Sequence, residues 1–426
     1  MVADLLGGTP PEKTSRHRHA GGAGALFLVT LVLFLFLGAG PAPPVKPPPT
    51  VVLLSMDGVR WDYPLRDHLP AFGAMAESGL CAGRLAPPFP SLTFPSHATL
   101  ATGVAPSAHG IVANAFLDRV MDHRFSDEPE ATWLNAEPLW VHCERAGMKA
   151  AVRSWPCSQG SWNGVSPSYF RAYESGDHDR ETIRWILDLL GRTAGERPRL
   201  IMAWTRGADG PGHAEGPDGA GVHRAMAAAD GLLAELRAGL KALDPPVPVD
   251  LLIVSDHGMA KVDRIVDPLT AIPKEGYFPF VASSGPVCNI YVKNETQRRQ
   301  VAAGLRRFPK DVLAMTRPEA AARFHYECPG RTGDFVLLCP PGATLSSLGR
   351  SRSRDLPRGM HGYDPALQDM GGIFYAEGPH FPAGKALAEV HAVDIAPTAC
   401  ACLGIPPPPR CEGRNLLSAP EAFRPR

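Results

Sequence analysis

Aspartate and histidine side chains follow apolar runs of this chain, and together these residue types can bind divalent metal ions. The run Thr50–Met56 leads to Asp57, and the run Asp250–Ser255 leads to Asp256 and His257. Carboxylate oxygens and imidazole nitrogens suit zinc and similar ions. We therefore expect metal chemistry at the points where these apolar runs end.

A third apolar run and a later motif add further candidates. The run Arg199–Thr205 is followed by Asp209 and His213, and "RGMHGYD" places His361 before a last apolar run, Gly372–Gly378. The candidates now number three carboxylates and three imidazoles. A pair of ions about 4 Å apart stabilises both oxygens of an in-line phosphoryl displacement. The combination predicts a site for two metal ions and phosphate chemistry.

The stretch "FPSLTFPSHATLATG" contains a candidate nucleophile, Thr93, just ahead of Pro95. A helix is expected to begin here, so one interpretation is an ordinary helix cap. The other is a nucleophile at a helix N-terminus, where the helix dipole favours a phosphate group. The metal candidates favour the second interpretation.

The elements that must position these residues alternate between two patterns. The four apolar runs read as buried strands, and helical patterns cover 68–79, 180–192 and 220–243. This alternation predicts an α/β fold with a mostly parallel sheet and helices on both faces. Sites in such folds form beyond the carboxyl ends of the strands. The less regular stretch 274–357 is a candidate for a small inserted subdomain or cap.

The motifs resemble those of the nucleotide pyrophosphatase/phosphodiesterase family of the alkaline phosphatase superfamily, and its bacterial members in particular. The resemblance is carried by "LLSMDGVRWD", "PSLTFPSHATLATGVAPSAHGIVAN", "EPLWVHCERAG", "DGPGHAEGP", "VSDHGM" and "HGYDPALQDM". It implies an alkaline-phosphatase-like mixed sheet, a catalytic domain over 50–426, and hydrolysis of phosphodiester or pyrophosphate bonds, with nucleotides as the expected small-molecule substrates.

The resemblance also implies two zinc ions and a role for each candidate. One ion would be held by Asp57, Thr93, Asp256 and His257, and the other by Asp209, His213 and His361. Thr93 would be the nucleophile, because zinc coordination lowers the pKa of a hydroxyl group that is otherwise a poor attacker. Its attack would give a phospho-threonine ester, which water then hydrolyses.

Three residues are expected to bind the substrate. Phe94 and Tyr173 would form the walls of a slot for a base, although both could instead be core aromatics, and Trp204 is expected in the core. Ser96 stands where the family usually has an asparagine whose amide donates a hydrogen bond to a phosphoryl oxygen. A serine hydroxyl can also donate one bond. Ser96 is therefore the departure from which an altered rate or substrate class is expected.

Two other functions stay open. A hydrolase or transferase of the same superfamily that acts on phospholipid headgroups or phosphonate esters is one alternative. A membrane-anchored, metal-containing binding protein with little turnover is the other. A sulfatase is disfavoured, because the stretch from Thr93 to His97 has neither the cysteine nor the arginine of that class.

The N-terminal region predicts passage out of the cytoplasm. Residues 1–24 would be a cytoplasmic segment, 25–40 a transmembrane signal anchor or a cleaved signal peptide, and 41–49 a proline-rich linker. The catalytic domain would then be periplasmic or extracellular, tethered to the membrane or secreted after cleavage.

The 43 acidic and 43 basic residues balance, so no nucleic-acid-binding surface is expected. Among the nine cysteines, Cys328 could pair with Cys339, and Cys411 with Cys400 or Cys402.

Overall fold

The computed structural model describes residues 49–272, 279–346 and 356–418. The predicted anchor or signal peptide at 25–40 lies outside these ranges, as does all of the predicted linker except Pro49. Within the described ranges, no helix is long and apolar enough to cross a membrane. The described residues belong to one compact unit.

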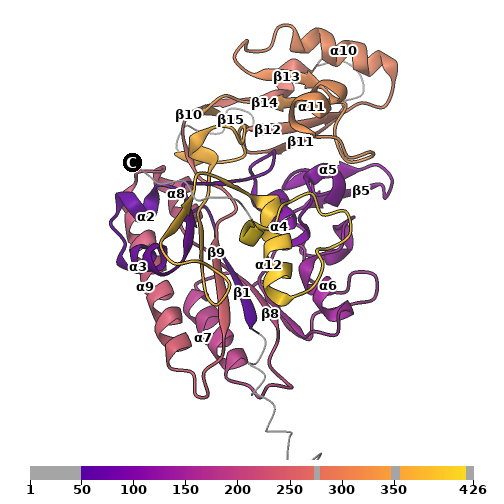
Figure 1. Ribbon diagram of the computed structural model, residues 1–426. Helices are drawn as coiled ribbons and strands as arrows, with labels where there is room; N and C mark the ends of the chain where they lie inside the picture. The colour runs from indigo at the N-terminus through magenta and orange to yellow at the C-terminus, as the bar shows by residue number, and fades with distance from the viewer. Residues whose placement is uncertain (1–48, 273–278, 347–355, 419–426) are drawn as a thin grey trace, which may run out of the picture. The chain divides into compact units, whose positions relative to one another are not determined.

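A central sheet of eight strands organises the molecule (Figure 1). Its strands, in spatial order, are β18 (Lys385–Leu387), β2 (Leu80–Ala82), β17 (Phe374–Glu377), β9 (Val249–Val254), β1 (Thr50–Met56), β8 (Leu200–Thr205), β6 (Ala150–Arg153) and β7 (Tyr169–Arg171). The five strands from β9 to β7 run parallel to one another. The sheet is therefore mixed but mostly parallel, as expected.

Strand β1 shows why the apolar runs become central strands. All of its residues are buried, with Val51 and Leu53 in the core on one face and Val52 and Leu54 in the core on the other. Successive side chains of a strand point to opposite faces, so a strand that is covered on both sides must be apolar throughout.

Helices cover both faces of this sheet, which confirms the predicted fold class (Figure 1). One core contains residues of α4 (Thr93–Thr102), α6 (Leu139–Arg145) and α12 (Ile395–Leu403), and the other contains residues of α3 (Pro70–Ser78), α7 (Asp179–Leu190) and α9 (Ala220–Lys241). The shorter helices α2 (Tyr63–Arg66), α5 (Pro106–His109) and α8 (Asp209–Glu215) lie in connections between strands.

Strand β17 differs from the expectation that every apolar run would be a parallel strand. It runs antiparallel to β9, with Phe374 opposite Val254 and Glu377 opposite Leu251. The start of β17 therefore lies beside the carboxyl end of β9. This direction has a consequence for the site, because a residue that precedes β17 reaches the same edge of the sheet as the residues that follow β1, β8 and β9.

A second sheet lies within the region where an inserted subdomain was expected. It contains β11 (Phe280–Ser284), β12 (Val287–Tyr291), β14 (Phe335–Leu338) and β13 (Leu313–Thr316), all antiparallel, and the chain between β12 and β14 forms α10 (Glu295–Leu305) and α11 (Arg317–Phe324). In Figure 1 this orange part projects beyond the central sheet. It has a core of its own. Its status as a separate domain with bounds 274–357 stays a prediction.

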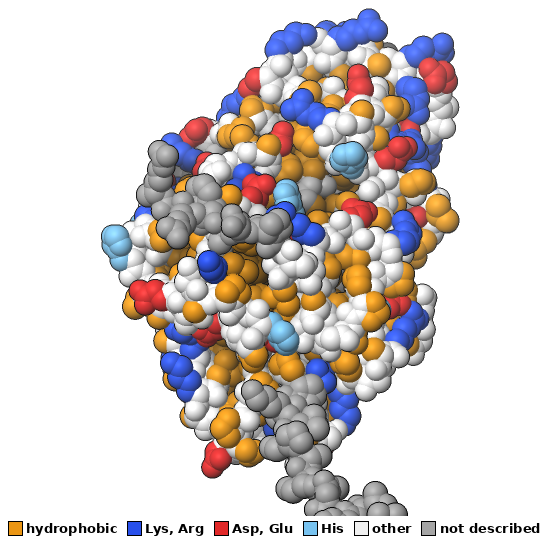
Figure 2. All heavy atoms as spheres, viewed as in Figure 1, with side chains coloured by type: hydrophobic (Ala, Val, Ile, Leu, Met, Phe, Trp, Pro, Cys, Tyr) orange, Lys and Arg blue, Asp and Glu red, His pale blue; other side chains and the backbone are white. Residues whose placement is uncertain are grey.

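Small sheets complete the described structure. Strand β10 (Ala260–Val266) pairs with β15 (Gly342–Leu345) and β16 (Gly359–Met360), β4 (Ala115–Asp118) pairs with β5 (His123–Ser126), and β3 (Leu85–Ala86) pairs with β19 (Val390–His391). All nine cysteines lie in the described part of the chain, and none forms a disulfide there, so neither suggested pairing is present. On the face shown in Figure 2, acidic and basic side chains are interspersed.

Candidate metal centre

The predicted metal ligands converge at the carboxyl edge of the central sheet. Three adjacent parallel strands, β9, β1 and β8, end in register there, with Ser55 opposite both Val254 and Trp204. Asp57 follows β1 directly, while the remaining acidic ligands follow β9 and β8. Parallel strands thus bring together side chains that are far apart in the sequence.

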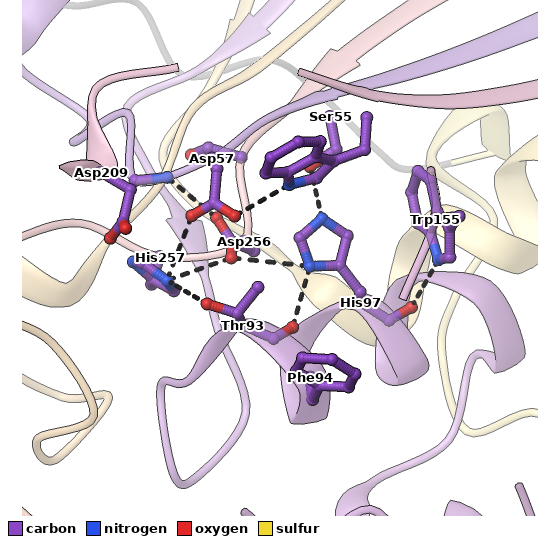
Figure 3. A network of polar contacts seen from close by, with 12 residues as sticks. Ser55, Asp57, Thr93, Phe94, His97, Trp155, Asp209, Asp256 and His257 are labelled. Carbon is purple, nitrogen blue, oxygen red and sulfur yellow. Dashed lines mark hydrogen bonds and ion pairs between the residues drawn. The ribbon is translucent and has the colours of Figure 1, made fainter. Parts of the chain in front are cut away.

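Three of the ligands form a first cluster (Figure 3). Nε2 of His257 lies 3.0 Å from Oδ2 of Asp256 and 3.6 Å from Oδ1 of Asp57. The other oxygen of Asp256 accepts a hydrogen bond of 3.0 Å from the backbone N–H of Gly58. All three side chains are almost fully buried, so a cation placed among them would be shielded from water.

A second cluster lies beside the first. Oδ1 of Asp209 is 3.2 Å from Nε2 of His213 and 3.5 Å from Nε2 of His361. His361 also stacks on His257, with ring centroids 3.4 Å apart. His361 directly follows β16, which pairs with β10, the strand that comes after Asp256 and His257 in the chain. His257 also lies close to Asp209 and His361, so it belongs to both groups of possible ligands. The division of the ligands between two ions, which the family resemblance implied, stays a prediction.

The imidazoles are oriented by the backbone. Each ring has its Nδ1 close to a backbone carbonyl oxygen. The distances are 2.9 Å from His257 to Gly258, 2.9 Å from His213 to Gly359, and 3.1 Å from His361 to Ser91. An Nδ1–H that donates to a carbonyl leaves the Nε2 lone pair free, and this is how histidine ligands are held in metal sites. In each of the three rings, Nε2 is the atom that faces the aspartates.

The carboxylates lack the partners that their burial demands. Within the described structure, Oδ1 of Asp57, Oδ1 of Asp209 and Oδ2 of Asp256 are buried without a hydrogen-bond partner. Burial, together with the charges of Asp256 and Asp209, raises the pKa of Asp57 well above its usual value. Burial lowers the pKa of His361 to about 3, which keeps that ring neutral. Although burial alone would lower them, the neighbouring aspartates raise the pKa values of His257 and His213. Crowded carboxylates beside imidazoles are the donor set that suits a divalent metal ion.

Thr93 begins α4 and faces both clusters. Its Oγ1 lies 3.2 Å from Nε2 of His257, and Figure 3 shows the hydroxyl directed at the buried carboxylates while the ring of Phe94 turns away from them. The N-terminus of α4 therefore lies beside the candidate metal site. A helix N-terminus there favours a bound phosphate group through its dipole.

His97 is part of the site, although sequence reasoning did not single it out. It lies one helical turn after Thr93, and its Nδ1 is 2.8 Å from the carbonyl oxygen of Thr93 and 3.5 Å from Oδ2 of Asp256. Nε2 is 2.9 Å from Oγ of Ser55. The four-residue spacing after Thr93 on a predicted helix was the available signal, because i and i+4 residues share a helix face. The ring links the start of α4 to the first cluster.

Trp204 corrects another expectation. It was assigned to the core, but its Nε1 donates a 2.8 Å hydrogen bond to Oδ2 of Asp57, and the ring lines a pocket beside the site. The register of β8 against β1 explains why Trp204 lies at the site and not in the core. Trp204 is near the end of β8 and pairs with Ser55, which is two residues before Asp57.

Ser96 does not face this pocket. Its side chain is fully buried, its hydroxyl oxygen has no hydrogen-bond partner within the described structure, and it is not among the pocket's lining residues. Asn114 contacts the start of α4 instead, since its Oδ1 accepts a 3.1 Å hydrogen bond from the backbone N–H of Phe94. The geometry gives no support to a substrate contact by Ser96, and Asn114 was not among the predicted site residues.

An aromatic pocket of about 270 Å³ opens beside Thr93. Its lining includes Phe94 and Tyr173, the two predicted slot residues, together with Trp155, Phe170 and Trp204. Tyr173 is 59% exposed, so it is not a core residue. The pocket has the shape and chemistry for a flat ring, because nucleic-acid bases stack favourably on aromatic side chains.

A third group of metal-ligand types lies at the other end of β9. Asp250, His380 and Cys402 lie close together there. Asp250 accepts hydrogen bonds from both the backbone N–H and Nδ1 of His380, at 3.1 and 2.7 Å. Both carboxylate oxygens of Asp250 therefore have a protein partner, whereas each aspartate of the candidate centre has an oxygen without one.

An α/β fold with candidate metal ligands at the carboxyl edge of its sheet is typical of metal-dependent enzymes. Residues 51–364 match the family model described as type I phosphodiesterase/nucleotide pyrophosphatase. A pyrophosphatase/phosphodiesterase of Schizosaccharomyces pombe, itself uncharacterized, is 30% identical over 81% of this chain and 75% of its own length. Mouse bis(5'-adenosyl)-triphosphatase enpp4 is 30% identical over 85% of this chain and 79% of its own length.

A solved structure agrees with these relatives. Mouse ectonucleotide pyrophosphatase/phosphodiesterase 5, an inactive threonine-to-alanine variant in complex with AMP, superposes with a TM-score of 0.77 at 27% identity, over 84% of this chain and 95% of that one. The chain therefore belongs to the type I phosphodiesterase/nucleotide pyrophosphatase family. It is a hydrolase of phosphodiester or pyrophosphate bonds in a metal-dependent family. The closer likeness to bacterial members stays a prediction.

Proposed function

We propose that this protein hydrolyses phosphodiester or pyrophosphate bonds of nucleotides with Thr93 as nucleophile and two zinc ions as cofactors. The observation that carries the proposal is the convergence of unpartnered aspartate oxygens and three Nε2 atoms around the Thr93 hydroxyl. Asp57, Asp256 and His257 would hold one ion together with Thr93. Asp209, His213 and His361 would hold the other. When bound, the ions supply positive charge for the phosphate and lower the pKa of the attacking hydroxyl.

The residues of the chain account for the remaining steps. The substrate base stacks in the aromatic pocket, which orients the phosphate at the start of α4. The Thr93 oxygen attacks phosphorus in line, the bond from phosphorus to the leaving oxygen breaks, and a phospho-threonine ester forms. Water then attacks the same phosphorus, which returns the Thr93 hydroxyl and releases a nucleoside monophosphate. Asn114 has an amide group beside Phe94 that can donate to a phosphoryl oxygen.

The test is turnover of a p-nitrophenyl ester of a nucleoside 5'-monophosphate by purified protein. We expect chelation to abolish turnover and added zinc to restore it, and we expect Thr93→Ala to reduce turnover by at least about 10³-fold. Thr102→Ala is the matched control, because Thr102 lies in the same helix and its hydroxyl donates to Ala98 O rather than to the site. Turnover that survives both chelation and Thr93→Ala would contradict the proposal.

The same preparation separates the alternatives. A panel of phosphocholine and phosphonate esters tests the lipid-headgroup or phosphonate-ester alternative, and preference for these over nucleotide esters would favour it. Metal binding without turnover on any substrate would favour the binding-protein alternative. The aromatic pocket beside Thr93 supports the nucleotide version, because a planar base fills it better than a flexible headgroup.

Membrane association and an extracytoplasmic location are proposed on sequence alone, from the apolar run at 25–40. Cell fractionation with the full chain and with a variant lacking 1–40 tests this. Membrane recovery of the full chain only would support an anchor, and recovery of both in the soluble cytoplasmic fraction would contradict the proposal.

A further inference from the structure

The aromatic pocket beside Thr93 has an acidic side chain at its rim. Most of its lining is apolar or aromatic, but Asp127 also lines it, together with the neutral polar residues Ser154, Ser158 and Gln159. Asp127 is the one carboxylate among the residues that line this pocket. Stacking on the aromatic walls accepts any base, so a preference among bases must come from polar groups such as this one.

The backbone fixes Asp127 relative to the nucleophile. The backbone N–H of Asp127 donates a 2.9 Å hydrogen bond to the carbonyl oxygen of Asn114. The side chain of Asn114 in turn accepts a hydrogen bond from the N–H of Phe94, which follows Thr93. Two hydrogen bonds therefore connect the backbone of Asp127 to the first turn of α4.

Asp127 also adopts a backbone conformation that non-glycine residues seldom use. Its φ is +52°, and Ser154 on the same pocket has a φ of +56°. Left-handed conformations of this kind cost free energy and cluster at ligand sites. Two of the described non-glycine residues with such a conformation therefore line this pocket.

The carboxylate of Asp127 lacks a donor. Asp127 is an exposed residue, and within the described residues its side chain forms no hydrogen bond or ion pair. Partial desolvation beside the pocket, followed by the nearby charge of Glu128, raises its pKa to about 6. It is therefore ionised at neutral pH and has acceptor capacity to offer. Gln159, by contrast, can both donate and accept, so it does not favour one kind of base edge.

We propose, on the basis of the proposed function, that Asp127 selects nucleotides of adenine and cytosine. The N6 amino group of adenine and the N4 amino group of cytosine lie at corresponding edges of the two bases and can donate to a carboxylate. Uracil, thymine and guanine carry a carbonyl oxygen at that position, which offers no donor to the carboxylate. The substrate class is then nucleotides of adenine and cytosine, with uracil, thymine and guanine nucleotides disfavoured.

Cytidine and uridine esters give the sharpest test, because the two rings are alike in size and differ at the amino edge. We expect kcat/KM for the p-nitrophenyl ester of cytidine 5'-monophosphate to exceed that of the uridine ester by about tenfold. Asp127→Asn should bring this ratio to within about twofold of one, since an amide offers a donor as well as an acceptor. Asp122→Asn is the matched control, because Asp122 is exposed, has a φ of +48° and does not line the pocket.

A failure of base selection by Asp127 can be distinguished from a failure of the proposed hydrolytic activity. Bis(p-nitrophenyl) phosphate has no base, so its turnover by the wild-type protein reports the chemistry alone. Dissociation constants of CMP and UMP for Thr93→Ala report base selection without turnover. A cytidine preference that Asp127→Asn removes and Asp122→Asn retains would support the proposal. Equal handling of the two bases by the wild-type protein, or a preference unaffected by Asp127→Asn, would overturn it.

Discussion

The hydroxyl oxygen of Thr93 lies 3.2 Å from Nε2 of His257, although 164 residues separate the two in the chain. The contact joins the start of α4 to the carboxyl end of β9, and it places the proposed nucleophile beside the first cluster of candidate ligands.

Trp204 is expected to orient Asp57. The variant Trp204→Phe keeps an aromatic ring but removes the 2.8 Å hydrogen bond from Nε1 to Oδ2 of Asp57. Removing such a partner of a metal ligand weakens metal affinity by about 10–100-fold. Competition with a chelator measures this. Trp162→Phe is the control, because Trp162 donates to the backbone of Leu134 instead, and equal loss of affinity in both variants would contradict the assignment.

Ser55 is expected to position His97. Its hydroxyl donates to Nε2 of His97, whose Nδ1–H donates to the carbonyl oxygen of Thr93. Ser55→Ala would leave that nitrogen without a partner in a buried site, and we expect kcat to fall by about tenfold with KM and metal content little changed. Steady-state kinetics and metal analysis check this, with exposed Ser166→Ala as control. A change in KM alone would argue against a positioning role.

Asp57 is expected to stabilise the metal-bound protein and destabilise the metal-free one. Its raised pKa arises from burial and from the like charges of Asp256 and Asp209, so its ionised form opposes folding at neutral pH when no cation is present. After chelation, Asp57→Asn should therefore melt at a higher temperature than the wild-type protein. With zinc added, the order should reverse. Thermal unfolding of both proteins in both states measures this, and the same order in both states would be inconsistent with a cation site.

His109 predicts how stability depends on acidity. It is fully buried, Nδ1 accepts a hydrogen bond from Ile111 N–H, and Nε2 is bonded to Thr99. Burial, and then Arg331, lowers its pKa from 6.5 to about 3. Between these values the unfolded chain binds a proton that the folded one does not, so stability falls as pH falls, by up to about 1.4 kcal/mol per pH unit from this group.

The variant His109→Asn removes this titration and keeps an acceptor for the Ile111 N–H. Urea unfolding at pH values from 7 to 4 should show a free energy of unfolding that declines less steeply for the variant than for the wild-type protein. Parallel curves would show that His109 does not carry the effect.

The convergence of the candidate metal ligands could be predicted from the sequence because its signal is local. Asp57 and Asp256 each follow a run of buried residues, and adjacent parallel strands must bring such residues to one edge. The direction of β17 could not be predicted, because an apolar run is the same whether its strand is parallel or antiparallel.

The surroundings of the ligands were harder to predict. The bond from Trp204 to Asp57 depends on the register of β8 against β1, which pairs residues about 150 positions apart. Asp127 lines the pocket, and Asn114 is hydrogen-bonded to Phe94 and to Asp127. Both residues belong to connecting segments, for which no periodic pattern exists. Ser96 shows the opposite error, since a residue near Thr93 in sequence was expected at the substrate but points into the core.

The most direct test of the central claim is to trap the covalent intermediate. Rapid acid quench during turnover of a nucleotide ester labelled at its phosphate, followed by proteolysis and mass spectrometry, should recover phosphate on Thr93 at a level that depends on bound metal. No phosphate should be recovered from Thr93→Ala. Label on a different residue would contradict the account. So would turnover that leaves no labelled protein under conditions in which hydrolysis of the phospho-threonine ester is slow.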